Sequence, residues 1–162
     1  MDRRRKLIIS IGALVVALGG FLWWRSPGVQ VPRAFAALEA AIEGGDAGGT
    51  LAALHPDYAL GAQFPNLVGE SADPRRAVLG LLFAVYQMQR DDPFIFDCTL
   101  GPVETRADGA AVVHATMHLS CRSGQLPFAI DPTLRRRFVL QRSGWLGRYR
   151  FADHDRIAIE RP

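Results

Sequence analysis

The apolar residues of this chain recur with a helical spacing before Pro93 and in alternation after it. A period near 3.6 residues places apolar side chains along one side of a helix, whereas a period of two places them on one face of a strand. Helices followed by hairpin-connected strands are typical of an α+β domain, in which helices cover one face of an antiparallel sheet. We therefore predict three N-terminal helices packed on a four-stranded antiparallel sheet.

The first predicted helix starts at Pro32, because proline suits the first helical turn, and ends at Gly44-Gly45. A shorter helix covers residues 50–54, and residues 58–70 are interpreted as a loop or short hairpin. The third helix has the clearest start, with Asp73 placed to cap it and Pro74 at its first position. The buried sides of the first and third helices are expected to carry Phe35, Leu38, Ala41 and Ile42, and Leu79, Leu82, Val85, Tyr86 and Met88.

Four strands are predicted after Pro93, at residues 94–105, 111–121, 135–142 and 145–151. Alternation sorts their side chains into an apolar face toward the helices and a polar outer face. The apolar face collects Phe94, Phe96, Cys98, Leu100, Val113, Ala115, Met117, Leu119, Cys121, Phe138, Leu140, Trp145, Tyr149 and Phe151. The outer face collects Asp97, Thr99, His114, Thr116, His118, Ser120, Arg137, Gln141, Arg148 and Arg150.

The N-terminal 24 residues have a composition of their own. A basic tip, residues 1–6, precedes 18 uncharged residues, 7–24, which as a helix would span about 27 Å. With Trp23 and Trp24 at its end, this segment predicts a single transmembrane helix with a cytoplasmic N-terminus and an exported domain, located at the inner membrane. A cleaved signal peptide and a twin-arginine signal are the alternatives; the first conflicts with the length of the apolar run.

The basic charge of the chain is concentrated at that end. The first 26 residues hold five of the 19 Lys/Arg and one of the 16 Asp/Glu, so 14 basic and 15 acidic residues remain. The pI of about 9.3 therefore reflects the tip, and nucleic-acid binding by the folded part is not expected.

The order of elements resembles the nuclear transport factor 2-like superfamily, which includes ketosteroid isomerases, polyketide cyclases and many non-catalytic domains. The resemblance rests on T-L-A-A-L-H-P-D-Y (50–58), the helix after Asp73 and the closing hairpin R-R-F-V-L-Q-R-S-G-W-L-G-R-Y-R-F (136–151). It implies a cone-shaped domain with a curved sheet over residues 32–155, after a linker at 25–31 and before a tail at 156–162. A membrane span before such a domain also resembles the periplasmic subunits of type IV secretion systems.

Two histidines four residues apart, His114 and His118, would suggest a metal site if they lay on a helix. On a strand they are separated by about 13 Å, too far for one zinc ion. No metal and no cofactor are expected. The outer face, with Asp97, His114, His118, Arg137, Arg148 and Arg150, is instead a candidate surface for a protein partner or a homodimer, as the superfamily often dimerises through it. Arg135, Arg136 and Arg137, with Arg148 and Arg150, could also form a basic stripe for an anion or a partner, and a solvated face is the alternative.

A cavity between sheet and helices is the second candidate site. Its predicted lining is Tyr58, Phe64, Tyr86, Cys98, Met117, Trp145 and Tyr149. Catalytic members of the superfamily project acids or bases into this cavity, but the strand positions here are almost all apolar, so no catalytic residue is assigned. His55, Asp57 and Tyr58 could reach the cavity mouth, although H-P-D-Y is also a helix stop and turn. His154 is interpreted as part of a solvated tail.

The resulting hypothesis is a membrane-anchored, non-catalytic interaction module on the outer side of the membrane, a partner-binding or self-associating component of an envelope assembly. A small-molecule binder using the aromatic cavity is the alternative, and a cyclase or isomerase enzyme is a third.

The two cysteines, Cys98 and Cys121, lie on the same face of neighbouring predicted strands. A two-residue loop at Asp108-Gly109 would leave them diagonal, whereas a loop at Gly109-Ala110 would place them opposite each other. An exported domain favours a disulfide between them. Two reduced, buried cysteines are the alternative.

Overall fold

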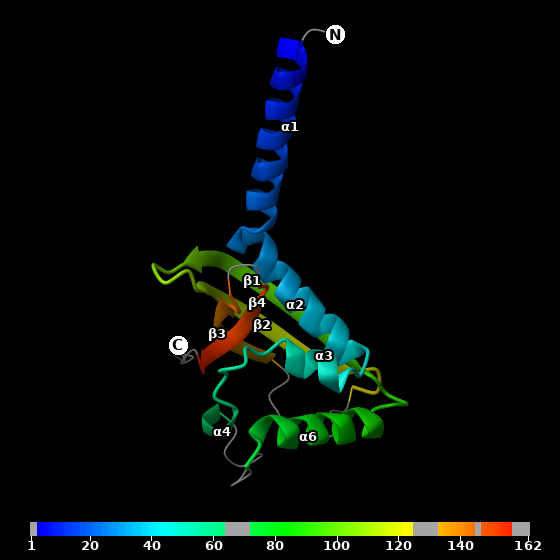
Figure 1. The fold of residues 1–162 in the computed structure, drawn as a ribbon. Helices are drawn as coiled ribbons and strands as arrows, with labels where there is room; N and C mark the ends of the chain where they lie inside the picture. The colour runs from blue at the N-terminus through cyan, green and yellow to red at the C-terminus, as the bar shows by residue number, and fades with distance from the viewer. Residues whose placement is uncertain (1–2, 64–71, 125–132, 145–146, 157–162) are drawn as a thin grey trace, which may run out of the picture.

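The computed structural model describes residues 3–63, 72–124, 133–144 and 147–156, which form helices followed by one sheet (Figure 1). The predicted α+β order is confirmed. The elements are α1 (Arg3–Trp24), α2 (Pro27–Glu43), α3 (Ala47–Ala52), α4 (Leu60–Gln63), α6 (Pro74–Met88), β1 (Phe94–Thr105), β2 (Ala111–Cys121), β3 (Thr133–Arg142) and β4 (Tyr149–Arg156).

The N-terminal segment forms α1, which projects away from the sheet and the other helices (Figure 1). In the part of the chain that the structure describes, no helix has both the length and the apolar character needed to cross a membrane. The prediction of a membrane anchor is corrected by this finding. The cellular location inferred from it stays an untested prediction.

The segment predicted as a linker, residues 25–31, is mostly helical, because α2 starts at Pro27 rather than at Pro32. Pro27 takes the first-turn position that suits proline, and Pro32 lies inside the helix. Val31, Phe35 and Ala41 are buried on α2, in agreement with its predicted apolar side, and the helix ends at Gly44.

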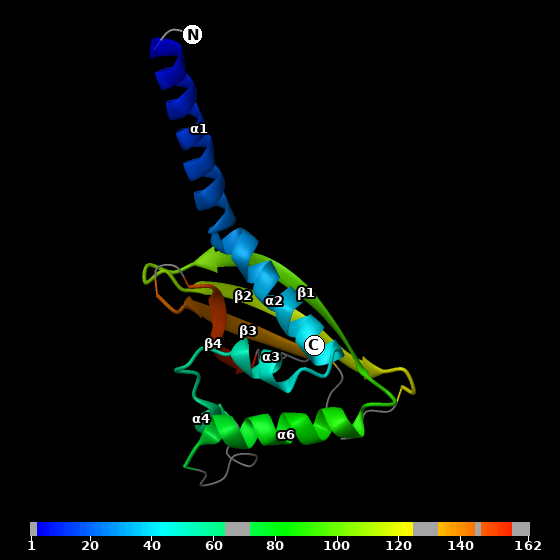
Figure 2. The same cartoon turned by 45° about the vertical axis from the view of Figure 1, so that its right-hand side comes forward.

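The helix after Asp73 begins as predicted, with the Arg76 backbone N–H donating to the Asp73 carboxylate (3.1 Å). Its expected burial is wrong, however, since no residue of α6 is buried and Leu79 is 37% exposed. The main contacts of α6 are with α3 and α4, below the sheet in the view of Figure 2. The spacing of apolar residues therefore predicted the helix correctly but did not predict that it packs against α3 and α4.

The sheet has the order β1-β2-β3-β4, and all neighbouring strands are antiparallel. Thr105 pairs with Ala111, and the turn between them closes with Gly109 at φ 81°. A β-bulge in β1, between Leu100 and Val103, shifts the pairing of β1 with β2. Because the loop is longer than two residues and the bulge shifts the register again, neither predicted pairing of β1 with β2 is correct.

The predicted alternation of faces does hold on β1 and β2. On the helix side Phe94, Phe96, Val113, Ala115 and Cys121 are buried, whereas Asp97, His114 and His118 on the outer side are exposed. The core lies between α2 and this sheet. Its centre is formed by the rings of Phe35, Phe138 and Phe151, which meet edge to face with centroids 4.8–5.4 Å apart.

Candidate functional site: an arginine-lined pocket

The residues predicted to line one cavity lie in several different places. Tyr149 is the first residue of β4 and is buried. The Tyr86 hydroxyl forms a hydrogen bond with Thr50 Oγ1 (2.9 Å). Tyr58 contacts His154. Cys98 and Met117 pack against the core cluster, while Phe64 and Trp145 lie outside the described residues. The structure therefore does not bring the described members of this set together around one space.

The predicted outer-face residues also divide into two groups. Asp97 lies opposite His118, and His114 lies opposite Arg137, on the outer side of the sheet. The His118 ring contacts the Thr133 hydroxyl (Nδ1 to Oγ1, 3.1 Å). Arg148 and Arg150 instead line a pocket beside the start of β4. Across the described ranges, no cluster of three or more His, Cys, Asp or Glu residues could hold a metal ion.

The two cysteines are free thiols, so the predicted disulfide is wrong. Cys98 lies opposite Met117 and Cys121 lies opposite Phe94, which separates the two along the strands. Burial, with a smaller contribution from the Glu39 carboxylate, raises the pKa of Cys98 to about 11. This thiol therefore stays protonated near neutral pH and packs as an apolar residue.

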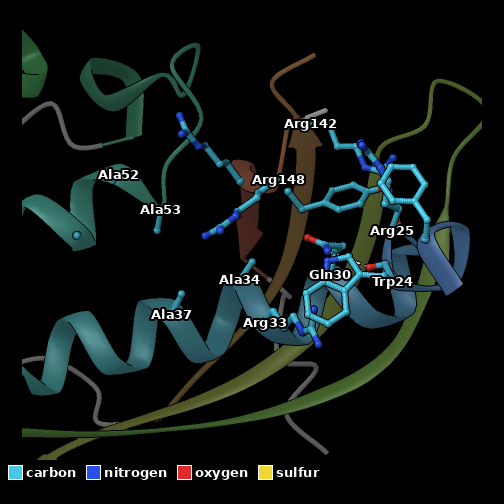
Figure 3. Close-up of a pocket in the computed structure, with 15 residues that line it drawn as sticks. Trp24, Arg25, Gln30, Arg33, Ala34, Ala37, Ala52, Ala53, Arg142 and Arg148 are labelled. Carbon is cyan, nitrogen blue, oxygen red and sulfur yellow. Dashed lines mark hydrogen bonds between the residues drawn. The ribbon is translucent and has the colours of Figure 1, made fainter. Parts of the chain in front are cut away.

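A pocket of about 660 Å³ lies between the α1–α2 junction, α3 and the β3–β4 end of the sheet (Figure 3). We call it the arginine pocket. Its lining is polar on one side and apolar on the other. The residues are Phe21, Trp24, Arg25, Gln30, Arg33, Ala34, Ala37, Gly49, Ala52, Ala53, Arg142, Gly147, Arg148, Tyr149 and Arg150.

Three of the five arginines rest on aromatic rings. The Arg33 guanidinium lies 3.4 Å from the centre of the Trp24 ring, that of Arg142 lies 4.6 Å from the Tyr149 ring, and that of Arg25 lies 5.4 Å from the Phe21 ring. Cation–π contact of this kind helps to hold a guanidinium group in position.

Two hydrogen bonds tie the helical side of the pocket to its surroundings. Arg142 donates to the backbone carbonyl of Arg25, which joins the end of β3 to the α1–α2 junction. Gln30 donates from Nε2 to the Trp24 carbonyl (2.9 Å). These contacts fix the position of the junction relative to the sheet, so the pocket wall formed by α1 and α2 is part of the folded domain.

The charge of the arginine pocket is of one sign. Five arginines line it, and none of its described lining residues is Asp or Glu. A concave surface with one sign of charge attracts ligands of the opposite sign. The arrangement can therefore bind an anion, with guanidinium groups donating hydrogen bonds to carboxylate or phosphate oxygens.

Sequence reasoning identified only Arg148 and Arg150 as possible anion-binding residues, because the parts of this site are far apart in the chain. Arg25 and Arg33 come from the helical half, whereas Arg142, Arg148 and Arg150 come from the closing hairpin. The one available signal is the density of arginine around the Ser143-Gly144 turn, a pattern that is also typical of a solvated face.

A second polar contact joins Tyr58, after α3, to His154 on β4. The Tyr58 hydroxyl contacts His154 Nδ1, and the two rings are stacked with centroids 5.8 Å apart. His154 is half-buried on β4, so the prediction of a solvated tail is wrong. His55 is also buried, and its Nδ1 accepts from the Asp57 backbone N–H (3.3 Å). H-P-D-Y thus makes local turn contacts and packs Tyr58 against β4.

The buried phenol predicts a loss of stability at high pH. Burial, then the Asp153 carboxylate, raises the pKa of Tyr58 from 10.0 to about 12, while Arg136 acts in the opposite direction. Because the folded-state pKa is the higher one, the protonated phenol contributes its full stability below about pH 10 and loses it as the pH rises toward 12. In urea unfolding, the stability difference between wild type and Tyr58→Phe should shrink over this window. A difference that stays constant from pH 9 to 12 would contradict the assignment.

No family model matches the chain, and no curated protein matches it. Several solved structures do. Aln2 from a Streptomyces species is 21% identical, with 81% of this chain and 92% of Aln2 covered and a TM-score of 0.53. A protein from Catenulispora acidiphila is 18% identical, with 77% and 86% covered and a TM-score of 0.53. A protein from Cytophaga hutchinsonii described as NTF2-like is 15% identical, with 82% and 99% covered and a TM-score of 0.48.

At these identities the similarity to Aln2 and to the Catenulispora protein concerns the fold alone. It agrees with the architecture described above, in which helices precede and cover an antiparallel four-stranded sheet. These observations support the α+β fold that the order of elements predicted.

Proposed function

We propose that this domain is a non-catalytic module that binds a small organic anion in the arginine pocket. The observation that carries the proposal is the lining of the pocket, with five arginines and no acidic residue among the described residues. A pocket volume of about 660 Å³ is also in the range of sites for small molecules.

The absence of catalysis is proposed from the same lining. Its described residues include no carboxylate, histidine or thiol. Arginine cannot serve as a general base near neutral pH because a guanidinium group stays protonated in proteins. The groups present can donate hydrogen bonds, stack and exclude water, and these are the requirements of binding.

The proposal is tested by calorimetric titration of the full-length chain with trimesate, a small aromatic tricarboxylate. Arg148→Gln combined with Arg150→Gln removes two charges from the pocket and should weaken binding by about tenfold or more, since hydrogen bonds to charged groups contribute roughly 1.5–3 kcal/mol each. Arg122→Gln, an exposed arginine that does not line the pocket, is the matched control and should leave binding within about twofold.

Two results would contradict this function. The first is that neither trimesate nor a simple monocarboxylate such as benzoate binds the wild-type chain. The second is that the control variant weakens trimesate binding as much as the double variant, because binding would then follow the net charge of the chain rather than the pocket.

A second candidate function is association with another protein, or with a second copy of this chain, through the outer face of the sheet. It is favoured by the exposure of Ile95 (38%), which shares that face with Asp97 and lies near His118 on the neighbouring strand. Light scattering separates the two candidates, because self-association increases the measured mass whereas binding of a small anion does not.

A further inference from the structure

The arginine pocket combines two kinds of guanidinium group. Arg33, Arg142 and Arg25 each lie over an aromatic ring. The guanidinium groups of Arg148 and Arg150 have no hydrogen bond, ion pair or ring contact with any residue that the structure describes. The first three are held by stacking, and the last two extend from the start of β4 with their charge uncompensated within the described residues.

Positive charge gathered in one pocket has a cost that a ligand can remove. The guanidinium groups of the pocket repel one another, and its described lining residues include no acidic side chain. This repulsion is weaker in water than in a closed site. A bound monoanion would neutralise only a small part of the charge, whereas each further negative group on the ligand can accept from another guanidinium.

The remaining walls are flat and apolar. Ala34 and Ala37 of α2 face Ala52 and Ala53 of the α3 region across the pocket, and Arg148 extends toward them in Figure 3. Alanine side chains leave a smooth surface without deep hollows for a branched aliphatic group. Trp24, at the other end, is 51% exposed, so part of its ring surface is open to a ligand. A planar ring fits such walls better than a puckered one, because it places its whole face within contact distance.

We infer that the ligand of the arginine pocket is a planar ring compound that carries two or more negative charges, as carboxylate or phosphate groups. This inference rests on the proposed function. The ring lies between the alanine walls and Trp24, and the negative groups accept hydrogen bonds from Arg148, Arg150 and Arg33. Carboxylates and phosphates share this chemistry, because the guanidinium fork matches the oxygens of both.

The charge requirement is tested by titrating the full-length chain with benzoate, isophthalate and trimesate, which place increasing charge on the same ring. Affinity should rise by about threefold to tenfold with each added carboxylate. Phenyl phosphate, a dianion at mildly alkaline pH, should bind about as tightly as isophthalate. The rise should be lost in the Arg148→Gln, Arg150→Gln double variant and kept in Arg122→Gln.

The ring requirement is tested at constant charge. Trimesate and its saturated counterpart, cyclohexane tricarboxylate, carry the same three groups on a flat and a puckered ring. Trimesate should bind about two- to tenfold more tightly, as ring stacking contributes roughly 0.5–1.5 kcal/mol. Trp24→Leu should reduce this preference, while Trp23→Leu, the neighbouring exposed tryptophan that does not line the pocket, should not.

The outcomes separate this inference from the proposed function. If none of these anions binds, both fail. If the anions bind but benzoate equals trimesate, or the saturated acid equals the planar one, the inference is overturned and the binding of an anion stands. If isophthalate binds and phenyl phosphate does not, the ligand is a carboxylate, and the part of the inference that includes phosphate is overturned.

Discussion

Replacing Phe35 with Ala is expected to lower the free energy of unfolding by about 3–5 kcal/mol. Phe35 is 2% exposed and stands at the centre of the core, with its ring edge to face against both Phe138 and Phe151. Truncation removes its apolar contact area, leaves a cavity between α2 and the sheet and deletes two aromatic pairs. The expected loss is a large part of the stability of a typical domain, so the variant should unfold at a clearly lower urea concentration.

Phe83→Ala is the matched control for this measurement. It removes the same side chain from α6, where Phe83 is 61% exposed, and should change the free energy of unfolding by less than about 1 kcal/mol. Equal losses in the two variants would mean that α6 is covered as completely as α2. A small loss in Phe35→Ala would contradict the position of the core.

The second large effect is expected at Arg75, near the start of α6. Its guanidinium donates to the backbone carbonyls of Leu51, Leu54, His55 and Pro56, at 3.0–3.4 Å. These carbonyls belong to the end of α3 and the turn after it, where a helix leaves acceptors unpaired. One side chain therefore satisfies several acceptors and joins α6 to α3.

Arg75→Ala should lower the free energy of unfolding by about 2–3 kcal/mol, because hydrogen bonds from a charged donor are lost and the carbonyls remain. Arg75→Lys keeps the charge but lacks the planar fork, so it should recover only part of the loss. Arg76→Ala, at the exposed neighbouring position, is the control and should have little effect. Full recovery by lysine would show that charge, rather than the fork, stabilises this junction.

The local features of the fold could be predicted from the sequence because each depends on neighbouring residues. Asp73 caps α6 because a carboxylate there can accept from the backbone N–H three residues on, and Pro74 fits the first turn. The prediction of two faces on β1 and β2 is correct even though the predicted register of the two strands is wrong. The observed pairing still matches even positions of β1 before the bulge with odd positions of β2, such as Phe96 with Leu119.

The register itself depends on features that local preference does not specify. The Asp108-Gly109 pair is compatible with a two-residue loop, but the observed turn is longer and is stabilised by two side-chain hydrogen bonds. The Asp108 carboxylate accepts from the Ala110 backbone N–H (2.9 Å), and the Tyr149 hydroxyl donates to the Gly109 carbonyl (3.1 Å). That second contact comes from β4, about 40 residues along the chain. The longer turn and the bulge together set a register in which Cys98 and Cys121 are not opposite each other.

The amino-acid sequence by itself determined the α+β order, the start of α6 and the two faces of β1 and β2, because capping and side-chain alternation act over a few residues. Only the tertiary structure decided the candidate site. Arg33 belongs to α2 and Arg148 to the loop before β4. No local pattern at Arg33 points to an anion, and the arginines around Arg148 are equally typical of a solvated face. Their charges act together because packing α2 against the sheet brings both to the arginine pocket, and electrostatic attraction depends on distance in space rather than along the chain.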